Sequence, residues 1–476
     1  MQSIIFSILP VFAPCILAEN LIVIMLDGVG NSLLKQTEYD SSSGFGLLTE
    51  NGVTSEYVTP VFPSQGYPNW YSLVTGLYAE NHGITADYMW DERSGMGFHR
   101  GASREDYDEI WWTQQPDPIW YTAGKSGMDV HCYWYANCHW PHIDMIVQVP
   151  IERQFNDSLP EQSEELPNYF PAIIERIKKY QSYKQQFFLI RYAGVANALR
   201  AYGSKSPEVK QAIHRTDQYL YDLQKRLDEN GLFSETNLVV VSDHGTHPVD
   251  IEEQFYIEDC LSDYSRIQKL VNIHSFMMIF PQNDSIDDVF FELKVCDQWA
   301  PEGDLDDDLT PLVNVYRASE LPGDLNWKNS RFMSPIVIMT QPGVVVLTRE
   351  LPTIPNIDFS KDVRETGGWS NALDTMHGIF LSRGPAFKSN HLHPPIKMVD
   401  IYQLLTNVLA IEPAHPHNGT WTTIEDMLSD NWEGKSVGEL ANSARPLRSL
   451  LITRFLSFYV IIMSVMTSAG VLLSSL

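Results

Sequence analysis

The chain has 476 residues, of which 44% are hydrophobic and 12% aromatic, so it carries enough apolar surface to bury a large core. This composition excludes a disordered tail or scaffold. The 60 Asp and Glu residues outnumber the 33 Lys and Arg residues, and the resulting net charge of −27 argues against binding to a nucleic-acid polymer. A small phosphate ester held by metal ions stays compatible with this charge.

The chain begins with an apolar stretch, residues 1–18, that ends in the small residue Ala18. Such a stretch is typical of a cleaved secretory signal, although no basic residue follows Met1 here. We expect residues 1–18 to be removed and residues 19–425 to form the folded ectodomain.

Apolar segments alternate with amphipathic segments through the first half of this ectodomain. Segments 20–26, 186–193 and 236–242 are rich in aliphatic residues and are predicted to be buried parallel strands. Segments 168–180 and 207–231 have a helical period. The alternation predicts an α/β fold with a doubly wound, mostly parallel sheet and helices on both faces.

The regular alternation is lost over residues 252–355, which are rich in turns and acidic residues. We expect this stretch to be an inserted region or cap. A clear helical period returns at residues 397–411.

Cysteines and glycosylation triplets support passage through the secretory route. Four cysteines follow the signal, which is compatible with two disulfides. Three pairings are possible, and proximity in the sequence favours Cys132 with Cys138 and Cys260 with Cys296. The permitted N-glycosylation triplets begin at Asn156, Asn283 and Asn418.

The chain ends in a hydrophobic tail, residues 455–476, that has 22 residues and no charge. Its length suffices to cross a bilayer, but the nearby bases all precede it, which disagrees with the charge asymmetry of a simple membrane span. Small residues beginning at Asn442, followed by a polar spacer, fit a removable GPI-anchor signal better. We expect residues 426–454 to be a juxtamembrane spacer and the protein to reach the cell surface on a GPI anchor or a transmembrane tail.

Polar side chains follow two of the predicted strands directly. Asp27 follows segment 20–26, and Asp243 and His244 follow segment 236–242. Ligand sites of open α/β sheets gather at the carboxyl ends of strands, so these three side chains could share one divalent metal ion. Taken singly, each has a plain structural explanation as a cap or a hydrogen-bonded side chain.

Five blocks of sequence resemble the ectonucleotide pyrophosphatase/phosphodiesterases of the alkaline phosphatase superfamily. They are Leu21–Gly28, Thr59–Ile84, Pro118–Gly127, Val239–Gly245 and Gly378–Lys388. The resemblance implies an alkaline-phosphatase-like α/β fold and a hydrolase with two zinc ions. Members of that family use a Thr or Ser nucleophile, and three Asp and three His side chains hold the zinc ions. One ion activates the nucleophile, the other activates water, and both neutralise charge on phosphorus.

Transferring this pattern to the chain places Gly66 at the nucleophile position. Glycine has no side chain that could attack phosphorus. Ser64 lies two residues earlier and is a poor substitute, because such a displacement points its side chain in another direction.

The second zinc site is also lost when the pattern is transferred. Ala196 and Arg200 fall at the positions of an Asp and a His, and Gly367 falls at the position of the other His. Arg200 is expected to bring a positive charge to the vacated place. His377 lies about ten residues too late, so a core or hydrogen-bonded role is favoured over a shifted ligand.

Asp87 occupies the position of an amide that steadies the phosphate in the family, where a carboxylate would repel the substrate. Only Asp27, Asp243 and His244, the ligands of one zinc ion, are retained. These losses predict a pseudoenzyme that holds one Zn²⁺ or none and binds a protein, glycan or nucleotide partner without turnover. The alternative is an active phosphodiesterase or nucleotide pyrophosphatase with an atypical single-metal site.

Overall fold

A computed structural model describes most of the predicted ectodomain. The described residues are 19–37, 39–99, 108–112, 115–133, 138, 147–148, 166–181, 183–250, 254–295, 311–349, 351–354 and 364–432. The predicted signal and C-terminal tail lie outside them, as do Asn156, Cys296 and Asn442. Within these ranges, no helix combines the length and the apolarity needed to cross a bilayer.

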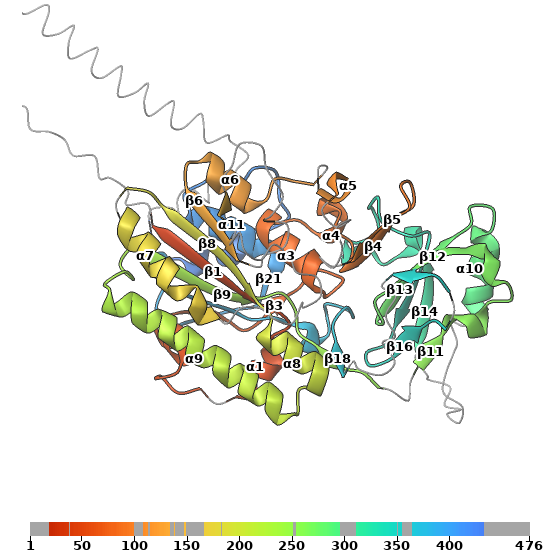
Figure 1. The fold of residues 1–476 in the computed structure, drawn as a ribbon, viewed down its shortest axis with the longest axis horizontal. Coiled ribbons are helices and arrows are strands. Elements are labelled where there is room, and N and C mark those ends of the chain that lie inside the picture. The colour runs from red at the N-terminus through yellow and green to blue at the C-terminus, as the bar shows by residue number, and fades with distance from the viewer. Residues whose placement is uncertain are drawn as a thin grey trace, which may run out of the picture.

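An eight-stranded sheet forms the centre of the molecule (Figure 1). Its strands, in spatial order, are β20 (His391–His393), β2 (Gly52–Ser55), β19 (Phe380–Arg383), β9 (Thr236–Ser242), β1 (Asn20–Leu26), β8 (Gln186–Tyr192), β6 (Asp129–Tyr133) and β7 (Val147–Gln148). All neighbours pair in parallel except β19, which is antiparallel to β9 and β2. The predicted mostly parallel α/β sheet is therefore confirmed.

Helices cover both faces of this sheet because both faces of its central strands are apolar. In β1, Leu21, Val23 and Met25 point to one face, while Ile22 and Ile24 point to the other. Against the first face pack α3 (Gly66–Thr75), α6 (Ile119–Lys125), α11 (Met398–Val408) and α12 (Trp421–Ile424). Against the second face pack α2 (Gly44–Asn51), α7 (Phe170–Tyr180), α8 (Gly194–Tyr202) and α9 (Pro207–Glu229).

Residues of the irregular stretch build a second sheet of five strands, on the right in Figure 1. Its strands, in spatial order, are β14 (Val313–Arg317), β15 (Ile336–Thr340), β13 (Phe276–Pro281), β12 (Ile267–Asn272) and β17 (Thr353–Ile354). Met277 and Ile279 of β13 face a core shared with α10 (Ile286–Lys294), whereas Met278 faces a core shared with Trp90. The second sheet therefore packs on the main body through one of its faces.

Shorter elements connect these layers. They are α1 (Asn31–Lys35), α4 (Ala79–His82), α5 (Glu109–Trp112), β3 (Val58–Thr59), β4 (Tyr88–Asp91), β5 (Met96–His99), β10 (His247–Pro248), β11 (Gln254–Tyr256), β16 (Val345–Leu347), β18 (Glu365–Thr366) and β21 (Ile396–Lys397).

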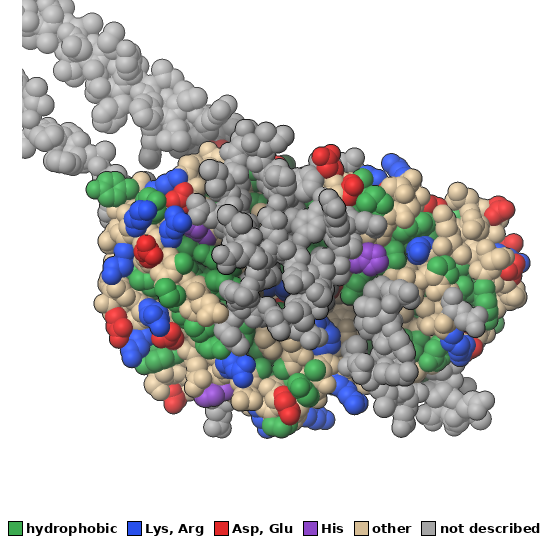
Figure 2. All heavy atoms as spheres, viewed as in Figure 1, with side chains coloured by type: hydrophobic (Ala, Val, Ile, Leu, Met, Phe, Trp, Pro, Cys, Tyr) green, Lys and Arg blue, Asp and Glu red, His purple; other side chains and the backbone are tan. Residues whose placement is uncertain are grey.

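The secretory features of the sequence fall on the surface or in disulfides where the structure describes them. A disulfide joins Cys132 to Cys138, as in the favoured pairing. Cys260 is also disulfide-bonded. Asn283 and Asn418 are exposed. On the face shown in Figure 2, Lys and Arg side chains are interspersed with Asp and Glu side chains.

One ion pair connects the main body to the second sheet. Arg331 donates from Nε to Asp91 Oδ1 at 3.0 Å and from Nη2 to Oδ2 at 2.8 Å. Burial acts to raise the pKa of Asp91, but the hydrogen bonds from Arg331 and Ser94 and the guanidinium charge outweigh it, so the pKa is lowered. The ionised carboxylate is therefore the form that stabilises this contact.

We predict that Asp91→Asn lowers the free energy of unfolding by about 1.5–3 kcal/mol at neutral pH, because Arg331 loses its charged acceptor. A carboxyl group whose pKa is lowered by folding stabilises the protein above its unfolded-state pKa, about 3.9. The difference between wild type and variant should shrink as the pH falls below that value, and urea unfolding at several pH values measures it. Asp259→Asn breaks an exposed pair with Arg349 and is the control, with an expected loss under about 1 kcal/mol. Equal losses in the two variants would contradict this prediction.

Candidate metal and phosphate site

The predicted metal ligands lie at the carboxyl ends of two neighbouring strands. Leu26 of β1 pairs with Ser242 of β9, so Asp27 and Asp243 leave the sheet side by side. Gly28 follows in a left-handed conformation with a φ of 68°, and its N–H donates to Asp243 Oδ1 at 2.8 Å. This turn needs glycine because other residues rarely adopt a positive φ.

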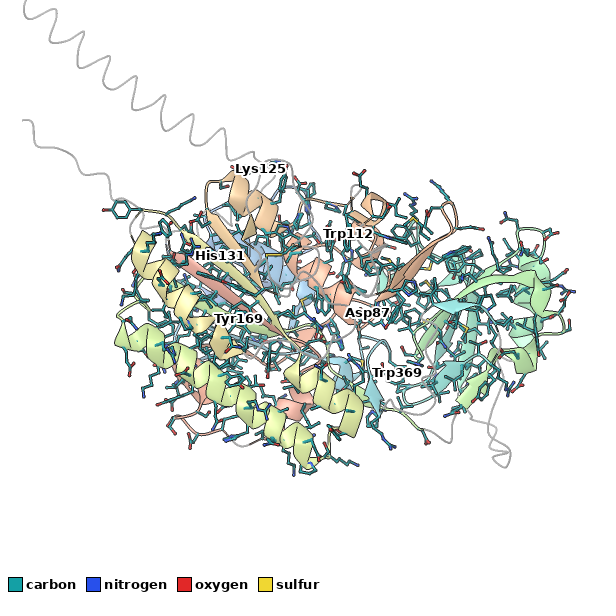
Figure 3. All side chains as sticks on the ribbon, viewed as in Figure 1. Asp87, Trp112, Lys125, His131, Tyr169 and Trp369 are labelled. Atoms are coloured by element: carbon teal, nitrogen blue, oxygen red, sulfur yellow. A yellow bond between two sulfur atoms is a disulfide. The ribbon has the colours of Figure 1, made fainter. Side chains whose placement is uncertain are left out.

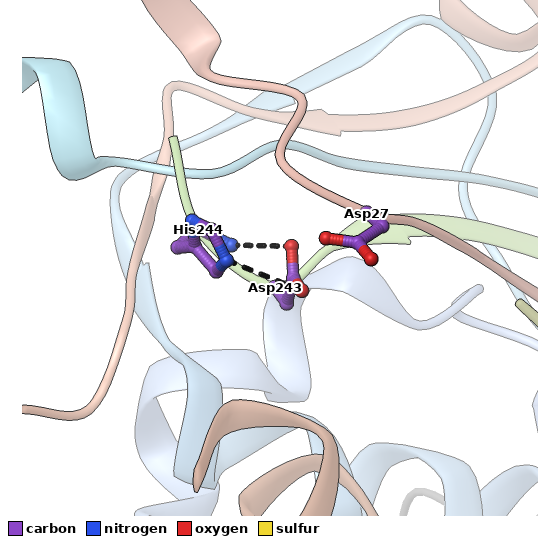
Figure 4. A group of neighbouring side chains, drawn as sticks. All are labelled: Asp27, Asp243 and His244. Carbon is purple, nitrogen blue, oxygen red and sulfur yellow. Dashed lines mark hydrogen bonds and ion pairs between the residues drawn. The ribbon is translucent and has the colours of Figure 1, made fainter. Parts of the chain in front are cut away.

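Asp27, Asp243 and His244 form a group of buried side chains at this point (Figure 4). Their ligand atoms all lie within 4.8 Å of one another, and they are the one such group among the residues that the structure describes. Two carboxylates and an imidazole are ligand types that zinc accepts. The three residues that the sequence predicted to share a metal ion are therefore neighbours in the structure.

The carboxylate of Asp243 has hydrogen-bond donors on both oxygens. Oδ1 accepts from the N–H groups of Gly28 and His244, each at 2.8 Å. Oδ2 accepts from the indole N–H of Trp70 at 2.6 Å. Burial is the main influence on its titration and raises the pKa of Asp243.

His244 is oriented by the backbone that follows it. Its Nδ1–H donates to the carbonyl of Gly245 at 2.7 Å, which leaves Nε2 directed toward Asp243 Oδ2 at 3.5 Å. The ring therefore presents the nitrogen that a metal ion would use.

Asp27 is paired with a cation that the sequence analysis did not identify. Arg191, in β8, donates from Nε to Asp27 Oδ2 at 3.1 Å, and its Nη2 contacts the same oxygen. The Asp27 side chain is 1% exposed and that of Arg191 is 19% exposed. The guanidinium also lies over the ring of Trp70, 4.2 Å from its centroid. Trp70 thus contacts both the Asp243 carboxylate and the cation that is paired with Asp27.

Trp70 also explains the glycine at the nucleophile position. Gly66 is the first residue of α3, and Trp70 lies one helical turn later. A Cβ atom at position 66 would lie 2.7 Å from Cζ2 and 3.1 Å from Cε2 of the Trp70 ring. The indole therefore occupies the space into which a nucleophile would project.

The N-terminus of α3 is occupied by carboxylate and amide groups of the protein itself. Asp87 Oδ1 accepts from the N–H of Tyr67 at 2.7 Å, and the N–H of Asp87 donates to Gln65 Oε1 at 3.3 Å. Figure 3 shows Asp87 where α3 approaches the second sheet. Since helix N-termini attract anions, the Asp87 carboxylate is the anion that occupies this one.

Asn69 holds the loop that leads into α3. Its side chain accepts from the N–H of Val61 at 2.7 Å and donates to the carbonyl of Gln65 at 2.8 Å. Ser64, which precedes Gln65, is buried, and its hydroxyl has no hydrogen-bond partner among the described residues.

The positions of the second family zinc lie beside the site but supply no ligand there. Ala196, in α8, is next to Gly28, because a Cβ atom added at position 28 would lie 3.2 Å from the Cβ of Ala196. Gly367 is next to His244, and a Cβ atom at position 367 would lie 2.9 Å from His244 Nδ1. Arg200 lies one turn beyond Ala196 and is half-buried. The guanidinium paired with Asp27 is that of Arg191 instead.

His377 has the core role that the sequence analysis favoured. Its ring stacks on Tyr57 with centroids 4.1 Å apart and planes inclined by 2°. Its backbone carbonyl accepts from the N–H of Asn31 at 2.8 Å.

Arg191 and Trp70 are the site residues that sequence reasoning missed. A signal for Arg191 was present, because it is the one charged residue in the apolar strand QFFLIRY. A charged side chain in a buried strand is ordinarily paired with an opposite charge, because burying an unpaired charge is costly. Trp70 gave no such signal, since large aromatic side chains at helical spacing are ordinarily core residues.

The three side chains are therefore of types that can bind zinc, but carboxylate oxygens of the site already accept hydrogen bonds. Zinc binds carboxylate oxygens at about 2.0–2.2 Å. Here Trp70 and Arg191 already donate to oxygens of Asp243 and Asp27. An ion that used Oδ2 of both Asp27 and Asp243 would compete with these donors.

Comparison with known proteins was made for the whole chain. The family model described as type I phosphodiesterase/nucleotide pyrophosphatase matches residues 21–379. The human protein named bis(5'-adenosyl)-triphosphatase ENPP4 is 27% identical over 454 residues, which cover 94% of this chain and 89% of the relative. Human ectonucleotide pyrophosphatase/phosphodiesterase family member 5 is 27% identical over 387 residues, which cover 81% of this chain and 73% of the relative.

Solved structures of similar fold include mouse and human proteins. An inactive variant of murine ectonucleotide pyrophosphatase/phosphodiesterase 5 in complex with AMP has a TM-score of 0.68 and 27% identity, covering 86% of this chain and 100% of that structure. Human ectonucleotide pyrophosphatase/phosphodiesterase 5 has a TM-score of 0.68 and 26% identity, covering 87% of this chain and 100% of that structure.

We predict that Gly66→Ala lowers the free energy of unfolding by about 1–3 kcal/mol, because the added methyl group overlaps the Trp70 ring. Alanine at an exposed helix position would instead stabilise the helix, so the sign of the change is informative. Gly323→Ala is the control, since no atom lies within 4 Å of the Cβ that it adds. Chemical unfolding of both variants measures the difference, and a stabilised Gly66→Ala protein would refute the overlap.

Proposed function

Because this chain belongs to the type I phosphodiesterase/nucleotide pyrophosphatase family, we propose that it is a non-hydrolytic member that acts by binding a partner. In this proposal a phosphodiesterase-like ectodomain reaches the extracellular face of the cell through a cleaved signal. A C-terminal GPI anchor or transmembrane tail holds it there.

The observation that carries this proposal is the pairing of Gly66 with Trp70. The nucleophile position has no reactive side chain, and the indole fills the space above it, with ring atoms 2.7 Å and 3.1 Å from the place of a Cβ atom. Covalent catalysis needs a nucleophile beside its activating group. Neither requirement is met at position 66.

The second zinc site supports the same proposal. Ala196 and Gly367 have no ligand atoms, and the Asp27 carboxylate is paired with Arg191. A water molecule attacking phosphorus would need a metal ion or a base to activate it. Among the described residues, no second group of three potential metal ligands lies around positions 196 and 367.

The ligand class follows from the charges at α3. Asp87 bonds to the N–H of Tyr67 at the helix N-terminus, so a phosphate group would meet a carboxylate there. A murine relative binds AMP in its inactive form, which makes a nucleotide an eligible ligand for the family. In this chain we favour a protein or glycan partner at the surface over a nucleotide in the former catalytic site.

The rival function is hydrolysis by an atypical site with one metal ion. Its support is the retained group of Asp27, Asp243 and His244, whose ligand atoms lie within 4.8 Å of one another. Such an enzyme would depend on all three side chains.

We predict no hydrolysis of a chromogenic nucleotide diester by the purified full-length protein, with or without added zinc. The human triphosphatase relative serves as the positive control for the assay. Turnover that disappears in Asp243→Ala, but not in the surface control Asp222→Ala, would establish the rival function and refute the proposal. Turnover insensitive to both changes would indicate a contaminating enzyme, and a repeat purification would remove it.

We also predict that AMP leaves the melting temperature of the protein unchanged, because Asp87 occupies the helix N-terminus that a phosphate would need. Differential scanning fluorimetry with AMP, with adenosine as the control for binding of the base, tests this expectation. A stabilisation by AMP that adenosine does not reproduce would contradict our choice of ligand class.

A further inference from the structure

We propose that the guanidinium of Arg191, supported by Trp70, is the resident cation of the Asp27–Asp243 site and excludes a zinc ion from it. This inference deepens the proposed function and rests on it, since it concerns the same site. It also goes beyond loss of activity, because it states that a protein side chain has taken over the metal's structural task.

Arg191 holds one oxygen of the Asp27 carboxylate. This carboxylate is buried, and Arg191 contacts its Oδ2 through both Nε and Nη2. The guanidinium therefore balances the charge of the carboxylate and holds Oδ2 in place. A bound zinc ion would perform these same two tasks for a ligating Asp.

The pairing of β8 with β1 brings Arg191 to this position. In the sheet, Arg191 of β8 pairs with Met25 of β1, whose side chain points to the face that α3 covers. Arg191 therefore leaves the sheet beneath α3, the helix that carries Trp70. A long side chain on this face can pass the last residues of β1 and contact Asp27.

Hydrogen bonds engage most of the Asp243 carboxylate. A carboxylate has about four lone-pair positions. Three of them at Asp243 are engaged by the N–H groups of Gly28 and His244 and by the indole of Trp70, the last at 2.6 Å. The Trp70 contact is on Oδ2, the oxygen nearest to His244 Nε2. The indole N–H therefore lies on the same oxygen that a metal bound to His244 would share.

Arg191 and Trp70 together connect the two carboxylates. The Arg191 guanidinium lies 4.2 Å from the centroid of the Trp70 ring, a favourable position for a cation over an aromatic face. A continuous series of contacts thus runs from Asp27 through Arg191 and Trp70 to Asp243. The two acids that a zinc ion would bridge are bridged by side chains of the protein.

The charge of Arg191 also disfavours a metal ion. Arg191 brings one positive charge to a pair of buried acids. A zinc ion would add two positive charges beside this guanidinium in a largely dehydrated site. Binding would require Arg191 to withdraw and Trp70 to rotate away from Gly66, against which its ring packs.

The experiment compares zinc binding by the wild-type protein and by Arg191→Met, which keeps an unbranched apolar side chain and removes the charged guanidinium. The full chain is dialysed against zinc, and bound metal is counted by atomic emission while the melting temperature is recorded. We expect no bound zinc and no shift for the wild type. For Arg191→Met we expect about one zinc per chain and a melting temperature that zinc raises by several degrees.

Two controls make the comparison specific. Arg383 also pairs with a carboxylate, Asp228, at 3.2 Å and lies 4.0 Å from the ring centroid of Phe233. Arg383→Met should therefore cost stability without producing a response to zinc. The double variant Asp27→Asn/Arg191→Met should lose the zinc response that Arg191→Met gains.

Cobalt gives a second readout where Arg191→Met does not fold. Arg191→Gln also removes the positive charge but keeps a polar group beside Asp27, so it is the milder change. Visible absorption of Co²⁺ bound to Arg191→Gln, absent from the wild type, would support the inference, and its absence from a folded Arg191→Gln protein would overturn it.

The outcomes separate the two proposals. Stoichiometric zinc on the wild type, lost in Asp27→Asn, would overturn the inference even if no hydrolysis is seen, and the proposed function would stand. A folded Arg191→Met protein that binds no zinc would also overturn it, because Arg191 would not be the group that excludes the ion. Hydrolysis by the wild type would overturn the proposed function itself.

Discussion

Two buried carboxylates at the ends of neighbouring strands impose the constraint on which this site depends. The pairing of β1 with β9 places Asp27 beside Asp243, and both are almost fully buried. Buried negative charges of this kind need positive partners or several hydrogen-bond donors, because the interior solvates them poorly. Relatives with two zinc ions are expected to meet this need with metal. In this chain Arg191, Trp70 and two backbone N–H groups supply the compensation.

Trp70 couples features that look independent in the sequence. Its indole N–H bonds to Asp243, its ring face lies under Arg191, and its ring edge fills the space above Gly66. A Cβ atom at position 66 would overlap the indole, which bonds to Asp243 and lies against Arg191. The glycine at position 66 and the contacts of the two acids are therefore one structural arrangement.

Much of the framework could be predicted from the sequence because it depends on local patterns. The apolar runs at 20–26 and 236–242 coincide with β1 and β9, and the polar residues after them predicted the Asp27, Asp243 and His244 group. The family pattern then located Gly66, Ala196 and Gly367, which the structure places around that group.

The rest depends on contacts between residues distant in the chain. Arg191 reaches Asp27 across paired strands, 164 positions away in the sequence, and Trp70 reaches Asp243 across 173 positions. We expected Arg200 to bring the positive charge, since alignment considers positions in order and does not show which side chain the sheet directs inward. Similarly, the strands of the second sheet carry short apolar runs that alternate between two cores, which the irregular pattern of residues 252–355 concealed.

The most direct test of the account is diffraction at the zinc absorption edge from crystals of the protein grown with zinc. The account predicts that the guanidinium of Arg191 lies against Asp27, that the indole N–H of Trp70 lies against Asp243, and that no anomalous peak appears between the two acids. An anomalous peak within bonding distance of Asp27, Asp243 and His244, with Arg191 displaced from Asp27, would contradict it.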